Sequence, residues 1–258
     1  MRKLIVLLLL FVFVVPVLAQ SEEVAHIRVA HFSVDAPTVD IYIDGMIEVE
    51  GMDFPVVSEW IEIPAGTHSI AIAPAGAPAE EAVIGPVNVD FAAESWLTVA
   101  AIGLAGNDTL GAQVLEENYT DLNAAEARLS VFHGILGVNL VNVIANDTTL
   151  IGGLGYPGAF GEESDGFQSV DVVVNTYNIE IQLEDGTTAV EVGSLKLGEN
   201  RNYFIAMVGT AANPQFVVMT SDITELMGGG EAAEEITAED LGEGQLWTQI
   251  GRASCRER

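Results

Sequence analysis

The stretch IRVAHFSVDAPTVDIYIDG, residues 27–45, contains the pattern that decides the fold. In its second part Val39, Ile41 and Ile43 fall on one face of an extended chain, because successive side chains of a strand point to opposite faces. The DAPT sequence before this run and the Asp-Gly pair after it are both typical of tight turns. The stretch therefore predicts two strands that are connected by a turn and followed by a hairpin.

The same pattern continues along most of the chain. Short runs rich in Val and Ile alternate with Gly, Pro, Asn and Asp about every eight to twelve residues, which is typical of an all-β sandwich. Further strands are predicted at 57–63, 68–73, 83–91, 95–103, 140–145, 170–175, 177–183, 189–195, 202–209 and 214–220. The sequence thus predicts an all-β fold made of antiparallel β-sandwiches.

A repeat divides this pattern into two parts. The segment ARLSVFHG at 127–134 repeats the beginning of the quoted stretch, with Arg128 and Phe132 in the places of Arg28 and Phe32. The strand predicted at 95–103 recurs in the same way at 202–209. A repeat period of about one hundred residues indicates domains in tandem. We therefore expect two tandem sandwiches, of which the second has diverged more.

Two polar stretches set the remaining boundaries. Residues 106–126 interrupt the regular succession of predicted strands. Residues 223–248 are rich in acidic residues and contain few apolar residues that a core could bury. We expect, in chain order, a signal peptide at 1–19, a first sandwich at 20–105, a linker at 106–126, a second sandwich at 127–222, a flexible acidic spacer at 223–248 and a tail at 249–258.

The N-terminus has the features of a secretory signal peptide. Arg2 and Lys3 precede an uncharged apolar run, and small residues lead to a cleavage site near Ala19. A membrane anchor is the competing interpretation, but Pro16 and the polar residues after the run favour cleavage. We therefore expect a secreted or cell-envelope protein with no membrane span in the mature fragment.

The last ten residues, QIGRASCRER, differ abruptly from the acidic stretch before them. They contain three arginines and the only cysteine of the chain. This decamer resembles the translation of a common short-read sequencing adapter, so we expect 249–258 to be an artefact that has no part in the fold. Whether the natural protein continues past Thr248 with an anchor or a further domain stays open.

The charge of the chain is extreme. It has 9 Lys and Arg residues against 38 Asp and Glu residues, which gives a formal net charge of −29. Such a surface repels nucleic acid and anionic lipid, because each phosphate contact needs a cation. Solubility in a saline medium, or binding of divalent cations, fits the charge better. With its one cysteine in the tail, the chain has no disulfide to stabilise it.

Three aspartates near the DAPT turn form a candidate calcium site. Asp35, Asp40 and Asp44 lie close together in sequence, and calcium prefers carboxylate and carbonyl oxygens from turns. The alternative is structural: Asp35 caps the turn and Asp44 forms the hairpin turn. The dense acidic spacing of a dedicated calcium loop is missing, so calcium is the one cofactor considered and the structural alternative is favoured.

Three aromatic residues form a candidate ligand surface. Tyr42, Trp60 and Trp96 all fall on the polar face of their predicted strands. Aromatic rings exposed on a flat sheet stack on sugar rings, but a sandwich more often buries such residues at its edge or beneath a loop. A glycan platform is therefore the weaker of these two interpretations.

No motif of a catalytic site is present. The chain lacks the HExxH and G-x-S-x-G patterns, and no catalytic residue is identified. A hydrolase with its site dispersed over distant strands is the third functional hypothesis, and nothing favours it. We do not expect an enzyme.

The quoted stretch, followed by IEIPAGTHSIAIAPAG and SWLTVAAIG, resembles the secreted bacterial family known as domain of unknown function 4397. The resemblance covers about residues 24–105, and the segment at 126–222 departs from it. It implies an immunoglobulin- or transthyretin-like sandwich, in pairs and exported, and no activity.

Our leading hypothesis is a non-enzymatic structural or adhesive protein whose partner is an extracellular polymer, a glycan or an envelope protein. The alternative is a calcium- or carbohydrate-binding accessory module.

Overall fold

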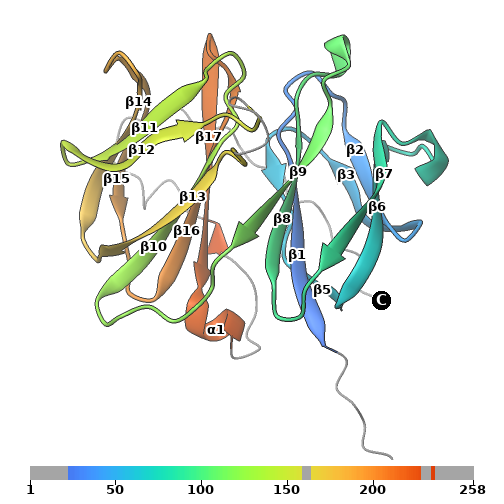
Figure 1. Cartoon of the computed structure of the whole chain (residues 1–258), viewed down its shortest axis with the longest axis horizontal. Coiled ribbons are helices and arrows are strands. Elements are labelled where there is room, and N and C mark those ends of the chain that lie inside the picture. The colour runs from blue at the N-terminus through green and yellow to red at the C-terminus, as the bar shows by residue number, and fades with distance from the viewer. Residues whose placement is uncertain (1–22, 159–163, 228–233, 236–258) are drawn as a thin grey trace, which may run out of the picture.

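The computed structural model describes residues 23–158, 164–227 and 234–235, which form an all-β molecule with two halves (Figure 1). Each half contains two sheets packed face to face. The predicted all-β sandwich class is confirmed. Within the described ranges, no helix is long and apolar enough to cross a membrane. The predicted signal peptide at 1–19 and the tail at 249–258 lie outside the described residues.

The N-terminal half is built from sheets A and B. Sheet A contains, in spatial order, β4 (Val56–Val57), β1 (Val24–His31), β8 (Trp96–Ile102) and β9 (Gly111–Glu117), and β5 (Ile61–Pro64) also pairs with β1. Sheet B contains β3 (Met46–Met52), β2 (Val39–Ile43), β6 (Gly66–Pro74) and β7 (Ile84–Phe91). Two short 3₁₀ helices lie in loops of this half, η1 (Ala79–Glu81) and η2 (Ala105–Asn107).

The C-terminal half is built from sheets C and D. Sheet C contains, in spatial order, β13 (Phe167–Val173), β10 (Glu126–His133), β16 (Arg201–Thr210), β17 (Asn213–Asp222) and β18 (Glu234–Glu235). Sheet D contains β12 (Thr148–Gly155), β11 (Leu140–Ala145), β14 (Thr176–Leu183) and β15 (Thr188–Lys196). The helix α1 (Ile223–Met227) follows β17 directly.

The two halves share one order of strands. In each half the first strand pairs in parallel with a later strand, β1 with β8 and β10 with β16, and the other pairs of strands are antiparallel. The prediction of antiparallel sheets is therefore wrong for these two pairs. The shared order agrees with a tandem repeat, which itself stays a prediction.

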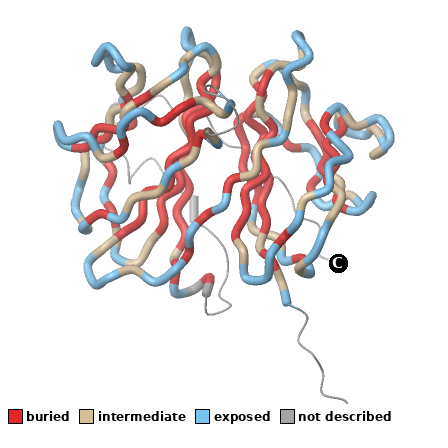
Figure 2. The backbone as a smooth tube through the Cα atoms, in the orientation of Figure 1, coloured by how far each residue is buried: buried red, intermediate tan, exposed pale blue. Residues whose placement is uncertain are grey.

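Sheet A is buried on both of its faces. Val29 and Ala101 pack against sheet B, whereas their neighbours in the chain, Ala30 and Ala100, pack in one cluster with residues of sheet C. The ring of Phe32 lies 5.7 Å from that of Phe132 within this second cluster. The molecule is thus a stack of four sheets in the order B, A, C, D, and buried backbone runs along the central strands of both halves (Figure 2).

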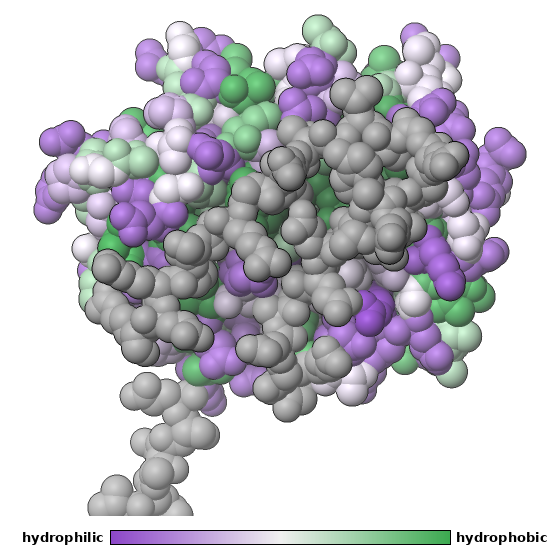
Figure 3. All heavy atoms as spheres, turned by 180° about the vertical axis from the view of Figure 1, so that it is seen from behind, coloured by the Kyte–Doolittle hydropathy of each residue, from purple (hydrophilic) through white to green (hydrophobic). Residues whose placement is uncertain are grey.

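Two predicted segments differ from the structure. Residues 106–126 are predicted as a linker, but they include β9, which forms the edge of sheet A. The predicted acidic spacer at 223–248 begins with α1 and includes β18, which pairs with β17. The end of β9 looks polar in sequence because it carries two acidic residues, of which Glu116 is exposed and Glu117 is buried. Seen from behind, hydrophilic side chains gather along the rim of both halves (Figure 3).

Candidate functional site: a cleft between the halves

Asp40, one of the three candidate calcium ligands, is a structural residue. Its side chain is buried, and the residue is 2% exposed. One carboxylate oxygen accepts a hydrogen bond from the backbone N–H of Gly51 and the other from that of Gly76, each at 2.7 Å. Both oxygens are therefore used to hold β3 and the turn after β6 against β2.

The other two candidates also bind backbone. The carboxylate of Asp35 accepts hydrogen bonds from the N–H groups of Ala105 and Gly106, which hold its pKa below the ordinary value. Asp44 accepts a hydrogen bond from the N–H of Ser69, which lowers its pKa in the same way, and it occupies the left-handed conformation of the hairpin turn. The place of Asp44 in the hairpin turn agrees with the structural alternative, whereas the contacts of Asp35 are to η2 and not to its own turn.

The structure does not bring the three aspartates together. Among the residues that it describes, no group of three or more His, Cys, Asp or Glu side chains is placed to hold a metal ion. The structure therefore gives no support to Asp35, Asp40 and Asp44 as one calcium site, and calcium binding stays a prediction. Each carboxylate instead accepts hydrogen bonds from backbone N–H groups of a different segment, which need acceptors of their own.

The three aromatic candidates do not form a shared surface. Tyr42 lies on β2 in sheet B, where its hydroxyl donates to the carbonyl of Ala77 at 2.8 Å. Trp96 begins β8 and is only 5% exposed, with its ring stacked on that of His26 at 3.8 Å. Trp60 packs edge-on against Trp96, with ring centroids 4.9 Å apart. Trp96 is thus buried, as the favoured of the two interpretations predicts for these aromatic residues.

A buried polar network lies where sheets A and C meet. Its centre is Glu117, the last residue of β9. One oxygen of its carboxylate accepts hydrogen bonds from Arg28, from Nη2 at 2.6 Å and from Nε at 3.1 Å. The hydroxyl of Thr98 donates to the same oxygen. The other oxygen accepts from Nδ2 of Asn202 and from the hydroxyl of Tyr119, both at 3.3 Å. We call these five residues the Glu117 network.

This network spans both halves, because Asn202 belongs to β16 of the C-terminal half, whereas the other four residues of the network belong to the N-terminal half. The guanidinium carbon of Arg28 lies 4.4 Å from the ring centroids of Trp60 and of Phe204, which also come from different halves. Aromatic faces attract a cation most when water is excluded. Burial and the charge of Glu117 raise the pKa of the Tyr119 hydroxyl, which therefore stays protonated as a donor.

Arg128 holds the connection between the halves. Its guanidinium pairs with both oxygens of Asp171 on β13, at 2.7 and 2.9 Å. The remaining nitrogen donates to the backbone carbonyls of Asn118 at 2.8 Å and Thr120 at 3.1 Å. The chain that leaves β9 is thereby fixed beside β13.

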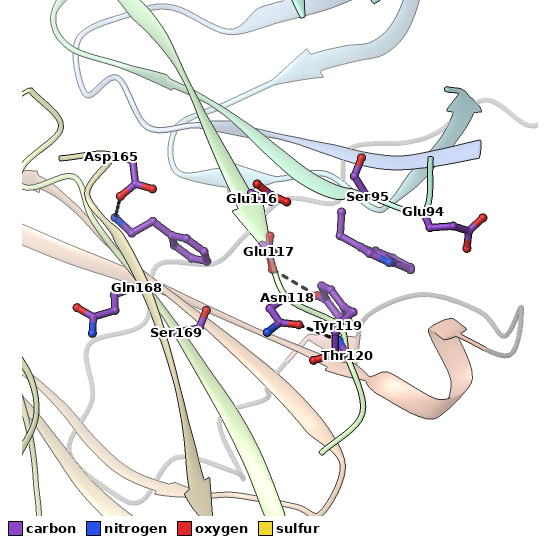
Figure 4. A pocket seen from close by; sticks show the side chains of 12 residues that line it. Glu94, Ser95, Glu116, Glu117, Asn118, Tyr119, Thr120, Asp165, Gln168 and Ser169 are labelled. Atoms are coloured by element: carbon purple, nitrogen blue, oxygen red, sulfur yellow. Dashed lines mark hydrogen bonds between the residues drawn. The ribbon is translucent and has the colours of Figure 1, made fainter. Parts of the chain in front are cut away.

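A cleft of about 620 Å³ lies beside this connection (Figure 4). On one side it is lined by the start of β8, the end of β9 and the chain after β9, and on the other side by β13. The lining residues are Glu94, Ser95, Trp96, Glu116, Glu117, Asn118, Tyr119, Thr120, Asp165, Phe167, Gln168 and Ser169. Sequence patterns contain no sign of this cleft, because its two sides are about fifty residues apart and come together only through packing of sheet A on sheet C.

The lining of the cleft has a clear chemical character. Glu94, Glu116 and Asp165 are exposed carboxylates, and none of the lining residues is Lys, Arg or His. Phe167 contributes a half-buried ring that packs near Phe204. Carboxylate and amide oxygens accept hydrogen bonds, so this arrangement favours a ligand rich in hydrogen-bond donors.

Comparison with known families gives one match. Residues 25–138 match the model of the family described as "Domain of unknown function (DUF4397)". The match extends past the predicted end of the first sandwich at 105 and includes β9 and β10. No curated protein matches the chain.

Several solved structures are similar at low identity. The TIE protein of Bacillus anthracis has 11% identity and a TM-score of 0.23, and the match covers 72% of this chain and 34% of that one. The chain therefore spans about a third of that protein. A family 26 carbohydrate-binding module of Eubacterium rectale Amy13K, in complex with maltoheptaose, has 9% identity, a TM-score of 0.26 and coverage of 77% and 99%. The tip fimbrial protein Mfa3 of Porphyromonas gingivalis has 8% identity, a TM-score of 0.25 and coverage of 77% and 99%. With TM-scores below 0.5, these likenesses carry no argument about function.

Proposed function

Since residues 25–138 belong to the DUF4397 family, we propose that the protein is an exported, non-enzymatic module that serves as a rigid structural or adhesive unit outside the cell. One observation carries this proposal: sheets A and C share a core, so the two halves form a single body. A rigid body that presents loops and edges at a fixed geometry is suited to holding or binding a partner rather than to closing around a substrate.

The shared core supports rigidity in energetic terms. Its buried residues come from both sheets and include Phe32, Phe132 and Phe204. Burial of one such aromatic ring contributes about 1.5–3 kcal/mol. Separation of the halves exposes all of them, and it also removes Asn202 of β16 from Glu117 and the ring of Phe204 from Arg28. Independent motion of the halves is therefore strongly disfavoured.

The predicted signal peptide and the acidic composition support the location. A net charge of −29 keeps such a chain soluble and repels anionic polymers. The cleft supports the non-enzymatic part of the proposal, since its lining residues include no His, Lys or Arg. The lining instead offers carboxylate, amide and hydroxyl groups around one aromatic ring.

Urea unfolding of the full chain tests the rigid unit. Hydrogen exchange measured by mass spectrometry after short pulses reports each half separately, through peptides from sheet B and from sheet D. We expect both halves to lose protection at one urea concentration. Two well-separated transitions would contradict a single body. Fractionation of cells that express the natural gene tests export, and retention of the intact protein in the cytoplasm would contradict it.

A further inference from the structure

The two sides of the cleft are lined by runs of consecutive residues. On one side the run is 116–120, and on the other it is 167–169 with Asp165 beside it. Successive residues of a strand point to opposite faces of the sheet, so a run of consecutive residues lines a cavity only along the edge of the strand. The cleft is therefore bounded on one side by the edge of β13, and on the other side by the end of β9 at Glu117 and the chain that follows it at 118–120 (Figure 4).

Both of these edges lack a partner strand among the described residues. β9 is the last strand of sheet A and pairs only with β8, and β13 is the first strand of sheet C and pairs only with β10. An unpaired edge presents backbone N–H and C=O groups that pair readily with an extended chain. β13 is the better template, because its residues 167–169 lie in the cleft as the start of a continuous strand, whereas β9 ends inside the cleft at Glu117.

The charge of the cleft selects the kind of chain. Glu94, Glu116 and Asp165 are exposed along it, and the lining residues carry no Lys, Arg or His to balance them. A second copy of this protein is disfavoured as the occupant, because each copy carries a net charge of −29. A segment with Lys or Arg at alternate positions satisfies the carboxylates, and the ring of Phe167 offers a face to its aliphatic stems or its cations.

From this geometry we propose that the cleft docks an extended basic segment of another protein, which adds to sheet C as a strand beside β13. The inference rests on the proposed adhesive function and deepens it, because it names the partner as a basic polypeptide. Backbone hydrogen bonds to β13 beyond Phe167, whose N–H already donates to Asp165 at 2.9 Å, supply the register, and Glu94, Glu116 and Asp165 select positive side chains.

The test uses the full chain and a synthetic peptide of four Lys-Thr repeats with blocked ends, in isothermal titration calorimetry at low salt. We expect saturable binding with one site. The double variant Glu116→Gln/Asp165→Asn is expected to weaken it about tenfold, since each exposed ion pair contributes modestly. A matched control, Glu80→Gln/Glu191→Gln, removes the same charge from exposed positions on η1 and β15, away from the cleft, and is expected to change affinity less than about twofold.

A second peptide tests the addition of a strand. It has the same sequence with alternate backbone amides N-methylated on the edge that would face β13, so that it keeps its charge but cannot complete the ladder. We expect a loss of affinity of about tenfold or more. Equal binding by both peptides would overturn strand addition, and equal losses in the two double variants would reduce the site to general attraction by an acidic surface.

Two other outcomes would also overturn the docking of a basic segment. If the peptide does not bind while both halves still unfold in one transition, the docking proposal fails and the rigid structural unit stands. If an uncharged oligosaccharide such as maltoheptaose binds instead, with the same sensitivity to the Glu116→Gln/Asp165→Asn variant, the occupant is a glycan and the basic segment is overturned.

Discussion

Glu117 accepts a hydrogen bond from Arg28 at a distance of 2.6 Å, and both side chains are completely buried where the two halves meet. The two residues are 89 positions apart in the chain, on β9 and β1. Removal of a charge from water is costly, and the pair is tolerated because Thr98, Tyr119 and Asn202 satisfy the remaining acceptor positions of the carboxylate. The pair lies within sheet A, and Asn202 and Phe204 of β16 connect it to sheet C.

The first prediction concerns this pair. We expect Glu117→Gln to lower the free energy of unfolding by about 3–5 kcal/mol, because it leaves the guanidinium of Arg28 buried without a counter-charge. Urea denaturation followed by circular dichroism measures the change. The double variant Arg28→Met/Glu117→Leu removes both charges and is expected to recover most of the loss. A Glu117→Gln protein within about 1 kcal/mol of the natural one would show that the pair is not needed.

The sequence predicts the strands well but not this contact. Alternation of apolar residues around Val39 fixes the faces of β2, and the repeat of Arg28 at Arg128 marks equivalent first strands. Nothing in the sequence pairs Glu117 with Arg28, because Glu117 lies in a polar stretch that is predicted as a linker. Period-two patterns report which side of a strand is buried and carry no information about the partner.

The cleft is beyond sequence reasoning for a related reason. The strand WLTVAAI of β8 is apolar almost throughout, which indicates burial on both faces. The pattern does not identify the sheet that covers the second face. Only the packing of sheet A on sheet C places Glu116 opposite Asp165 across the cleft. The candidates drawn from the sequence, by contrast, are residues with conspicuous chemistry near turns, and Asp40 shows that such chemistry serves the turns themselves.

The second prediction concerns the C-terminal helix. The sequence predicts a flexible spacer from residue 223 onward, but Ile223 and Leu226 of α1 are buried against Trp96 and Tyr119. We therefore expect a chain ending at Asp222 to be less stable than a chain ending at Met227 by about 3 kcal/mol, since each lost side chain contributes about 1.5–3 kcal/mol.

The comparison is matched, because both truncated chains lack β18. Thermal and urea unfolding of the two proteins give the difference. The point variant Leu226→Ala in the longer chain is expected to reproduce about half of it. Equal stability of the two truncated chains would restore the prediction that the spacer begins at 223.

The third prediction concerns pH. His133 is fully buried, its Nε2 lies 3.1 Å from the carbonyl of Val138, and burial lowers its pKa to about 4. The unfolded chain, with an ordinary pKa of 6.5, binds a proton between these values and the folded chain does not. Stability is therefore full above pH 6.5 and falls as the pH decreases, by about 2 kcal/mol at about pH 5 from this residue.

Urea unfolding at about pH 7.5 and about pH 5 measures this dependence, and the variant His133→Gln is expected to flatten it. His68 provides a control within the same protein, because its contribution to stability changes with pH in the opposite direction. Its contact with Asp44 raises its pKa, so its contribution is present at low pH and is lost as the pH rises through the folded pKa. His68→Gln should therefore steepen the loss of stability in acid slightly. An unchanged slope in His133→Gln would contradict burial of a neutral imidazole.

The last prediction separates the structural role of Asp40 from calcium binding. Asp40→Ala leaves the N–H groups of Gly51 and Gly76 without their acceptor, and each unsatisfied group costs about 1–3 kcal/mol. We expect the free energy of unfolding to fall by about 2–4 kcal/mol, and by less for Asp40→Asn, which retains one acceptor oxygen. Glu48→Ala, an exposed change on β3 of the same sheet, should have almost no effect. Calcium should leave the Tm of the natural protein and of these three variants unchanged, and a calcium-dependent rise that Asp40→Ala abolishes would return Asp40 to the role of a metal ligand.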